Sequence, residues 1–197
     1  MSLSSSFGRV TTALVRAIDP SLVQAALRLT PTAKGEEVCL KTAQQQHDNL
    51  VNILRTECGI PEVYELSSGG YADSVFIEDT AVAIGPNVLV TTPGAESRQG
   101  EVIDVRNRLK QLDGVKVASM EKLDPEARMD GGDVMFTGYE LIVGISSRTN
   151  AAGADAIQEA FPNVPVRTVD IQQFGDTSLH LKFVNDGCVS TNNIGFD

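Results

Sequence analysis

Asp130-Gly131-Gly132-Asp133-Val134-Met135-Phe136 is the stretch that decides the fold, because an acidic turn with two glycines leads directly into an apolar strand. Glycine permits backbone conformations closed to other residues, so the chain can turn tightly and bring both carboxylates near one point. The sequence after this stretch predicts a partner strand over residues 141–145, a helix from about 151 to 161 and a strand over 164–169. Arg148 lies between the partner strand and the helix.

An earlier segment repeats this order. Its parts are the acidic pair Glu78-Asp79, strands over 81–84 and 88–91, Arg98 at the start of a helix, and a strand over 115–118. Repeated units that cannot bury their own faces stack against their neighbours, and radial stacking brings corresponding turns near one axis. The sequence therefore predicts an α/β propeller of ββαβ repeats, with two adjacent α/β units that share ordinary turn chemistry as the alternative.

The first part of the chain predicts a strand, a short helix, a long helix and another strand. The strand covers Ala13-Leu14-Val15, and Asp19-Pro20 starts the short helix with Asp19 as its N-cap. The long helix runs from about Glu36 to Gly59, with apolar residues at helical spacing, and a strand over residues 63–66 follows.

Charge and composition restrict the classes of partner. The 197-residue chain has a net charge of −10, which disfavours nucleic acid as a partner and favours a cationic small molecule. Three cysteines without metal-type spacing indicate a reducing compartment. Residues 1–6 do not resemble a signal peptide, and no apolar run reaches the ~20 residues of a membrane span. We therefore expect a cytoplasmic protein with no nucleic-acid or membrane partner, and the cysteine spacing does not predict a metal site.

Three carboxylates are candidates for binding a planar cation. Glu78 and Asp79 close a predicted strand over residues 75–77, in which neighbouring side chains point to opposite faces. Asp73 follows a glycine-rich approach, and Phe76 is expected in the core or stacked on a ligand. A carboxylate suits a guanidinium because the planar fork forms two parallel hydrogen bonds. The alternative for each is a turn residue without a ligand.

Two arginines and one histidine complete the candidate site. Arg98 and Arg148 each precede a helix, where a guanidinium could bind a substrate carboxylate or simply face solvent. His180 lies between Leu179 and Leu181 in a predicted apolar strand; it could transfer protons to a leaving amine or be a buried structural residue. His47, the other histidine, is predicted to be structural.

Together these residues resemble dimethylarginine dimethylaminohydrolases. The matching pieces occur in family order over residues 7 to 182: Phe7-Gly8-Arg9, Ala33-Lys34-Gly35-Glu36-Glu37-Val38, Val75-Phe76-Ile77-Glu78-Asp79, Pro93-Gly94-Ala95 with Ser97-Arg98, Asp130-Gly131-Gly132-Asp133-Val134, Phe136-Thr137-Gly138, Arg148-Thr149-Asn150 and Leu179-His180-Leu181-Lys182. The resemblance implies a five-bladed propeller of ββαβ units, the fold shared with arginine deiminases and amidinotransferases. It also implies hydrolysis of methylated arginines to citrulline and dimethylamine or methylamine, in support of nitric oxide synthesis.

The resemblance assigns a role to each candidate. His180 would be the catalytic acid and base. Asp73, Glu78 and Asp79 would bind the methylated guanidinium, and Arg98 and Arg148 would anchor the amino-acid end of the substrate. Leu27 would lie on a segment that closes over the pocket, with residues 30–35 allowing it to move. No cofactor is implied.

The chain departs from the family at its end. The family nucleophile is a cysteine thiolate near the C-terminus, and Cys188 matches no family position. Cys39, in the long predicted helix, and Cys58, next to its end, are expected to be structural. We therefore expect a C-terminally truncated member with an incomplete propeller domain over residues 1–182 and a divergent tail over 183–197, poorly stable or inactive as a monomer. The open alternatives are a non-catalytic methylarginine binder and a related arginine deiminase or amidinotransferase. The oligomeric state is not predicted.

Overall fold

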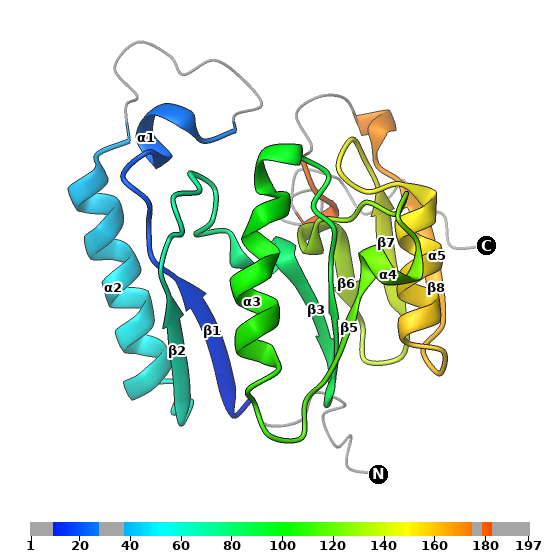
Figure 1. The fold of residues 1–197 in the computed structure, drawn as a ribbon, viewed down its shortest axis with the longest axis horizontal. Helices are drawn as coiled ribbons and strands as arrows, with labels where there is room; N and C mark the ends of the chain where they lie inside the picture. Colours follow the sequence, from blue (N-terminus) through cyan, green and yellow to red (C-terminus); the bar gives the residue numbers. More distant parts are fainter. Residues whose placement is uncertain (1–9, 28–37, 175–178, 183–197) are drawn as a thin grey trace. The chain divides into compact units, whose positions relative to one another are not determined.

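A computed structural model describes residues 10–27, 38–174 and 179–182 of the chain (Figure 1). The chain divides into two compact units. Unit 1 comprises residues 1–77 and 96–113, and unit 2 comprises residues 78–95 and 114–197. Within the described ranges, no helix combines the length and the apolar character that crossing a membrane requires.

Unit 1 contains a two-stranded parallel sheet and its helices. The elements are β1 (Thr12–Arg16), α1 (Leu22–Ala25), α2 (Leu40–Thr56), β2 (Glu62–Leu66), the 3-10 helix η2 (Glu96–Glu101) and α3 (Val102–Leu109). Strands β1 and β2 pair from Thr12 opposite Glu62 to Arg16 opposite Leu66. Both predicted strands and the long helix are confirmed, although the helix is shorter than expected. Gly59, with φ of +61°, follows it in the left-handed region that glycine tolerates.

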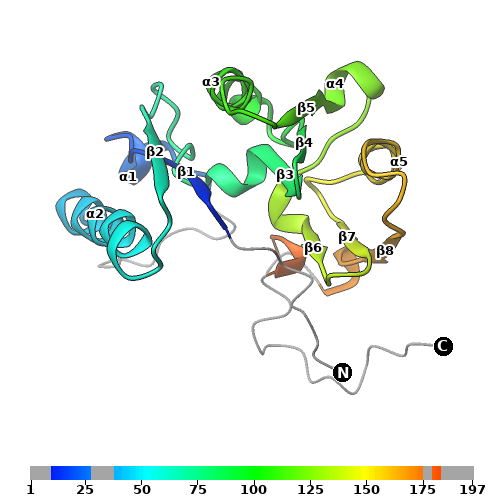
Figure 2. The same cartoon turned by 90° about the horizontal axis from the view of Figure 1, so that it is seen from below.

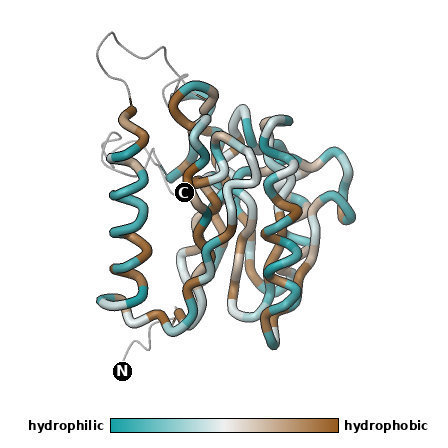
Figure 3. The backbone as a smooth tube through the Cα atoms, turned by 60° about the vertical axis from the view of Figure 1, so that its left-hand side comes forward, coloured by the Kyte–Doolittle hydropathy of each residue, from teal (hydrophilic) through white to brown (hydrophobic). Residues whose placement is uncertain are grey.

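Only part of the predicted apolar face of α2 is buried. Val51 is buried, whereas the neighbouring apolar residue Leu50 is 51% exposed. Figure 3 shows the helical segments in alternating hydrophilic and hydrophobic bands, as expected for helices that bury one side. The short α1 has Ser21 as its N-cap instead of the predicted Asp19. Asp19 still supports the turn, because it accepts hydrogen bonds from the backbone N–H and the hydroxyl of Ser21.

Unit 2 contains two copies of the same three-stranded sheet. The first consists of β3 (Ala81–Ile84), β4 (Asn87–Val90) and β5 (Lys116–Ser119), and the second of β6 (Val134–Phe136), β7 (Leu141–Ile145) and β8 (Val166–Asp170). In each, the first strand pairs antiparallel with the second, and the second pairs parallel with the third. Figure 2 shows the two sheets, with β3 and β6 at corresponding edges. The predicted strand order of the repeat is confirmed.

Helices and 3-10 turns connect these strands. They are α4 (Met120–Leu123), α5 (Ala151–Ala160), η1 (Ile77–Thr80), η3 (Gly131–Asp133) and η4 (Gln172–Phe174). One apolar cluster of unit 2 joins both sheets to α4 and α5, with Leu89, Met120, Leu141 and Ile157 completely buried. Asn150 caps α5, since its side chain accepts a hydrogen bond from the N–H of Gly153. This core fixes the turns that precede β3 and β6.

Two predicted strands are wrong. Residue 75 lies in a turn, which the hydrogen bond from the N–H of Phe76 to the carbonyl of Asp73 closes, and Ile77 begins η1. Phe76 is 52% exposed, so it is not the core residue that the sequence suggested. His180 lies in a bend followed by helical residues 181–182. Here the N–H of Leu181 bonds to the carboxylate of Asp133 instead of to a neighbouring strand.

Candidate active site

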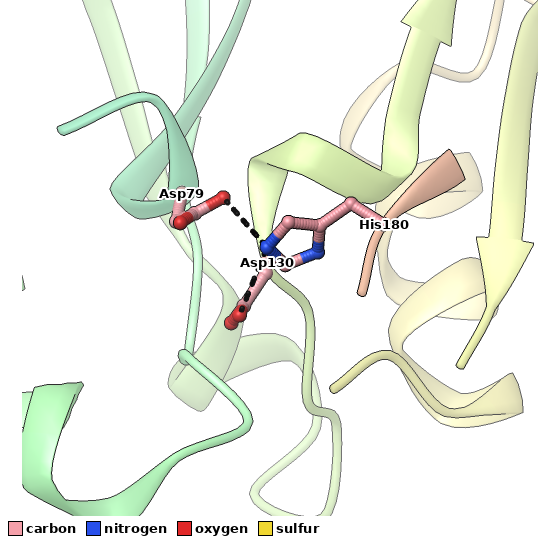
Figure 4. A group of neighbouring side chains, drawn as sticks. All are labelled: Asp79, Asp130 and His180. Atoms are coloured by element: carbon pink, nitrogen blue, oxygen red, sulfur yellow. Dashed lines mark ion pairs between the residues drawn. The ribbon is translucent and has the colours of Figure 1, made fainter. Parts of the chain in front are cut away.

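The imidazole of His180 lies among three buried carboxylates of unit 2. Its Nε2 is 3.8 Å from Oδ1 of Asp79 and 4.0 Å from Oδ2 of Asp130, and its Nδ1 is 3.6 Å from Oδ1 of Asp133. Figure 4 shows His180 between Asp79 and Asp130, which come from the turns before the two sheets. All four residues are buried, with exposed fractions of 5% or less. Residues far apart in the sequence therefore form one polar cluster.

The carboxylates control the charge of His180. Burial alone would lower the pKa of the imidazole, but the contact with Asp133 and the charges of Asp79, Asp133 and Asp130 outweigh it, so the pKa is raised. With all three aspartates ionised, even a protonated His180 leaves the cluster negative. A desolvated excess of negative charge is costly unless a cation compensates it. The cluster is therefore suited to a cationic ligand.

Two glycines let the turns approach this closely. A Cβ on Gly132 would lie 2.9 Å from ring carbons of His180 and 3.0 Å from Oδ1 of Asp79. A Cβ on Gly131 would overlap the carbonyl oxygen of Glu78. Neither glycine has a positive φ, so the predicted reason, an unusual backbone conformation, is wrong. The glycines are needed for close approach, which leaves the N–H of Gly132 free to donate to Asp79 at 2.9 Å.

The sequence pointed to Asp130 and Asp133 as a motif but not as site residues. Oδ1 of Asp130 accepts a hydrogen bond from the N–H of Gly94 at 2.9 Å. Oδ2 of Asp133 accepts hydrogen bonds from the hydroxyls of Ser146 at 2.7 Å and Thr149 at 2.6 Å. The expectation that the motif brings both carboxylates near one point is confirmed. Ser146 and Thr149 were missed; their signal in the sequence was the three hydroxyl residues Ser146, Ser147 and Thr149 around Arg148.

Glu78 and Asp79 have different environments, although they are neighbours. Asp79 is buried in the cluster, whereas the carboxylate of Glu78 is 60% exposed and pairs with Lys182 at 3.1 Å. Arg148 lies beside the cluster by its backbone, because its N–H donates to Ser146 and a Cβ on Gly94 would overlap its carbonyl oxygen. Unit 2 thus brings together four of the predicted site residues: Glu78, Asp79, Arg148 and His180.

The other three predicted residues lie together in unit 1. The N–H of Leu27 donates to the carboxylate of Asp73 at 3.1 and 3.2 Å. The guanidinium of Arg98 donates to the carbonyl oxygens of Asp73 and Phe76 and pairs with the buried carboxylate of Glu101 at 2.9 Å. Burial raises the pKa of Glu101 against the opposing effect of Arg98. The predicted hinge over residues 30–35 lies outside the described residues.

The buried cluster could also accommodate a metal ion by proximity alone. Single ligand atoms of Asp79, Asp130 and His180 lie within 4.8 Å of one another. Carboxylates and imidazole bind several divalent metals, so this geometry selects none, and we assign no metal to the site. Among the described cysteines, Cys39 and Cys58 are exposed and belong to unit 1. Cys188 lies outside the described residues.

Known proteins with similar sequences point to one family. Residues 13–196 match the model of the family described as RNA-editing substrate-binding complex 5 protein. The chain is 34% identical over 164 residues to the putative hydrolase DDAH2 of Bos taurus, covering 83% of this chain and 55% of that protein. It is 33% identical over 170 residues to the dimethylarginine dimethylaminohydrolase of Streptomyces coelicolor, covering 86% and 62%. The chain thus spans little more than half the length of these relatives.

Solved structures with a similar fold come from the same group of proteins as the sequence relatives. A cysteine-to-serine mutant of the Pseudomonas aeruginosa enzyme, complexed with citrulline, has a TM-score of 0.71 and 25% identity, covering 87% of this chain and 64% of the other. The N-terminal domain of a cyanobacterial arginine dihydrolase has a TM-score of 0.63 at 20% identity and shows the fold alone. These matches confirm the predicted class, an α/β propeller of ββαβ units of the amidinotransferase and arginine deiminase type. The resemblance to dimethylarginine dimethylaminohydrolases that the sequence predicted is thus confirmed, and the chain belongs to the family described as RNA-editing substrate-binding complex 5 protein.

Proposed function

We propose that unit 2 of this chain binds the guanidinium of a methylated arginine and supplies the proton-transferring histidine of its hydrolysis to citrulline. The observation that carries the proposal is the position of His180 within 4.0 Å of three buried carboxylates. A guanidinium is a permanent planar cation with several N–H donors, so it compensates the negative charge and pairs with carboxylates in a fixed orientation.

The chemistry of the cluster follows from its charges. A guanidinium held by Asp79 and Asp130 lies against Nε2 of His180, because both carboxylates face that atom. In the mechanism that the resemblance implies, a cysteine thiolate bonds to the guanidinium carbon, the C–N bond to dimethylamine or methylamine breaks, and a protonated His180 gives the leaving nitrogen its proton. Water then attacks the same carbon and gives a proton to Nε2, and the thiolate leaves as citrulline is released. Arg148, tied to Ser146, is proposed to anchor the amino-acid end of the substrate.

Roles for unit 1 remain part of the proposal. Asp73 and Leu27 are hydrogen-bonded to each other and are proposed to bind the substrate from a second segment. Arg98 is proposed to help anchor the substrate carboxylate, with Glu101 holding its guanidinium in place. We also propose that the domain extends over residues 1–182, that the protein is cytoplasmic, and that its activity indirectly supports nitric oxide synthesis.

A second candidate is a non-catalytic methylarginine binder. The observation that favours it is that both described cysteines, Cys39 and Cys58, are exposed, whereas His180 is buried. The matching family model is named for an RNA-editing complex, so such a binder could act within an assembly. A net charge of −10 disfavours direct contact with RNA. A related arginine deiminase or amidinotransferase is the third candidate, supported by the shared fold.

The test is a calorimetric titration of the full chain with dimethylarginine, together with an assay for citrulline. Saturable binding that is weakened at least tenfold by Asp79→Asn supports the binding site. Asp155→Asn, on the exposed face of α5, is the matched control and should bind as wild type does. Citrulline formation supports the hydrolase, and binding without citrulline supports the second candidate. Absence of binding to both dimethylarginine and arginine contradicts all three candidates, and a preference for plain arginine favours the third.

A further inference from the structure

The carboxylate of Asp133 is held from several sides, although the chemistry proposed above does not use it directly. Its Oδ2 accepts hydrogen bonds from Ser146 and Thr149, and its Oδ1 accepts one from the N–H of Leu181 at 3.0 Å. Asp133 is completely buried. Because both oxygens have fixed donors, the direction of this carboxylate is set before any ligand binds.

Asp133 holds His180 at two points. The same Oδ1 that accepts from the N–H of Leu181 lies 3.6 Å from Nδ1 of His180. One oxygen thus contacts both the ring and the peptide that follows it. Gly144 makes room for this contact, since a Cβ there would lie 2.9 Å from Cβ of Leu181 and 3.4 Å from that oxygen. The arrangement constrains the ring's rotation as well as its position.

The two ring nitrogens therefore face different groups. Nδ1 faces Asp133, whose carboxylate oxygens already accept hydrogen bonds from Ser146, Thr149 and Leu181. Nε2 faces Asp79 and Asp130. In a histidine, the hydrogen bond made by one nitrogen decides which nitrogen is available for chemistry. The carboxylate at Nδ1 is held by two hydroxyls and one peptide N–H, whereas Asp79 and Asp130 both lie on the side of Nε2.

We propose that Asp133 is a positioning residue that keeps a proton on Nδ1 of His180, so that Nε2 exchanges protons with the bound ligand. The part of this proposal that concerns the orientation and the protonated nitrogen of His180 does not depend on hydrolysis. Only the use of Nε2 on a guanidinium rests on the proposed function. In this arrangement, Ser146 and Thr149 act on His180 through Asp133.

The test is nitrogen-15 NMR of the full chain carrying His47→Gln, which leaves His180 as its one histidine because the sequence contains two. Above the pH at which His180 loses its charge, the ring nitrogen shifts distinguish a proton on Nδ1 from one on Nε2. We expect the Nδ1–H form to predominate. Predominance of the Nε2–H form in the folded protein would overturn the proposal, and this measurement requires no variant of Asp133.

A substitution then tests Asp133 itself. Asp133→Asn keeps the size and one acceptor oxygen but removes the charge, and the hydroxyls of Ser146 and Thr149 can accept from the new amide. We expect the fraction of Nδ1–H to fall and the titration midpoint of His180 to move to lower pH. The control Asp155→Asn should change neither, and an Asp133→Asn spectrum identical to that control contradicts the proposal. Failure of dimethylarginine to bind while Nδ1–H predominates would instead count against the proposed function alone.

Discussion

Oδ1 of Asp79 accepts a hydrogen bond of 2.9 Å from the backbone N–H of Gly132 and thereby joins the turn before β3 to the turn before β6. The same oxygen lies 3.8 Å from Nε2 of His180. The two repeats of unit 2 therefore meet at their acidic turns, and the histidine lies at that meeting point. The peptide N–H thereby holds the carboxylate of Asp79 where it faces the imidazole.

Replacing Gly132 by alanine should disrupt the cluster, because the new Cβ would lie 2.9 Å from the ring of His180. Overpacking at a buried position costs about 1–3 kcal/mol of unfolding free energy, which urea denaturation can measure. Binding of dimethylarginine should also be lost, since both Asp79 and His180 must shift. Gly85→Ala is the comparison: it meets no atom within 4 Å, so its strain at a φ of +57° should lower stability without weakening ligand binding. Unchanged binding in Gly132→Ala would contradict the site geometry.

Asp79→Asn and Glu78→Gln should differ greatly in their effect on binding. Loss of a buried charged partner costs about 1.5–3 kcal/mol, so Asp79→Asn should weaken dimethylarginine binding roughly 10- to 100-fold. Glu78 is 60% exposed and pairs with a lysine at the surface, so Glu78→Gln should change affinity much less. Calorimetry of the two variants measures both values. Equal losses would show that Glu78 contacts the ligand as closely as Asp79 does.

The stability of the protein should decrease as the pH rises above 6.5, the ordinary pKa of histidine. The pKa of His180 is raised in the folded state above its ordinary value of 6.5. Between these two values the folded protein binds more protons than the unfolded chain, so the stabilising contribution is complete below pH 6.5 and is lost through the folded pKa. Urea unfolding across this range measures it. His180→Gln should remove this component, and His47→Gln should retain it; an unchanged profile in His180→Gln contradicts the prediction.

Breaking the buried pair of Arg98 and Glu101 should destabilise unit 1. Glu101 is 1% exposed, and Arg98→Met would leave its carboxylate buried without its cationic partner. Such losses cost about 3–5 kcal/mol, whereas replacing both members with apolar residues is often neutral. We therefore expect Arg98→Met to lower the unfolding free energy strongly and Arg98→Met with Glu101→Leu to recover most of it. A double variant as unstable as the single one would mean that the carbonyl contacts of Arg98 dominate.

Sequence patterns predicted most of the regular structure because those patterns are local. The strand pair over residues 81–84 and 88–91 needed only apolar runs around a turn, and its partners β3 and β4 occupy residues 81–84 and 87–90. The helix predicted from about residue 151 to 161 is α5 (Ala151–Ala160), and the structure adds that Asn150 caps it. The strand predictions for residues 75–77 and 179–181 were wrong for the opposite reason. Both runs are apolar, but a turn bond to Asp73 and a distant bond to Asp133 overrode the strand pattern.

The sequence by itself determined the ββαβ repeat, the acidic turn that starts each repeat and the family that the chain resembles. Only the tertiary structure decided that Asp133 faces Nδ1 of His180 while Asp79 and Asp130 face Nε2. It also decided that Glu78 turns outward to Lys182. The physical reason is distance along the chain: hydrophobic periodicity and turn chemistry act over a few neighbouring residues. The charge of a buried cluster depends on which remote segments the core packs together, and on glycines small enough to let them meet.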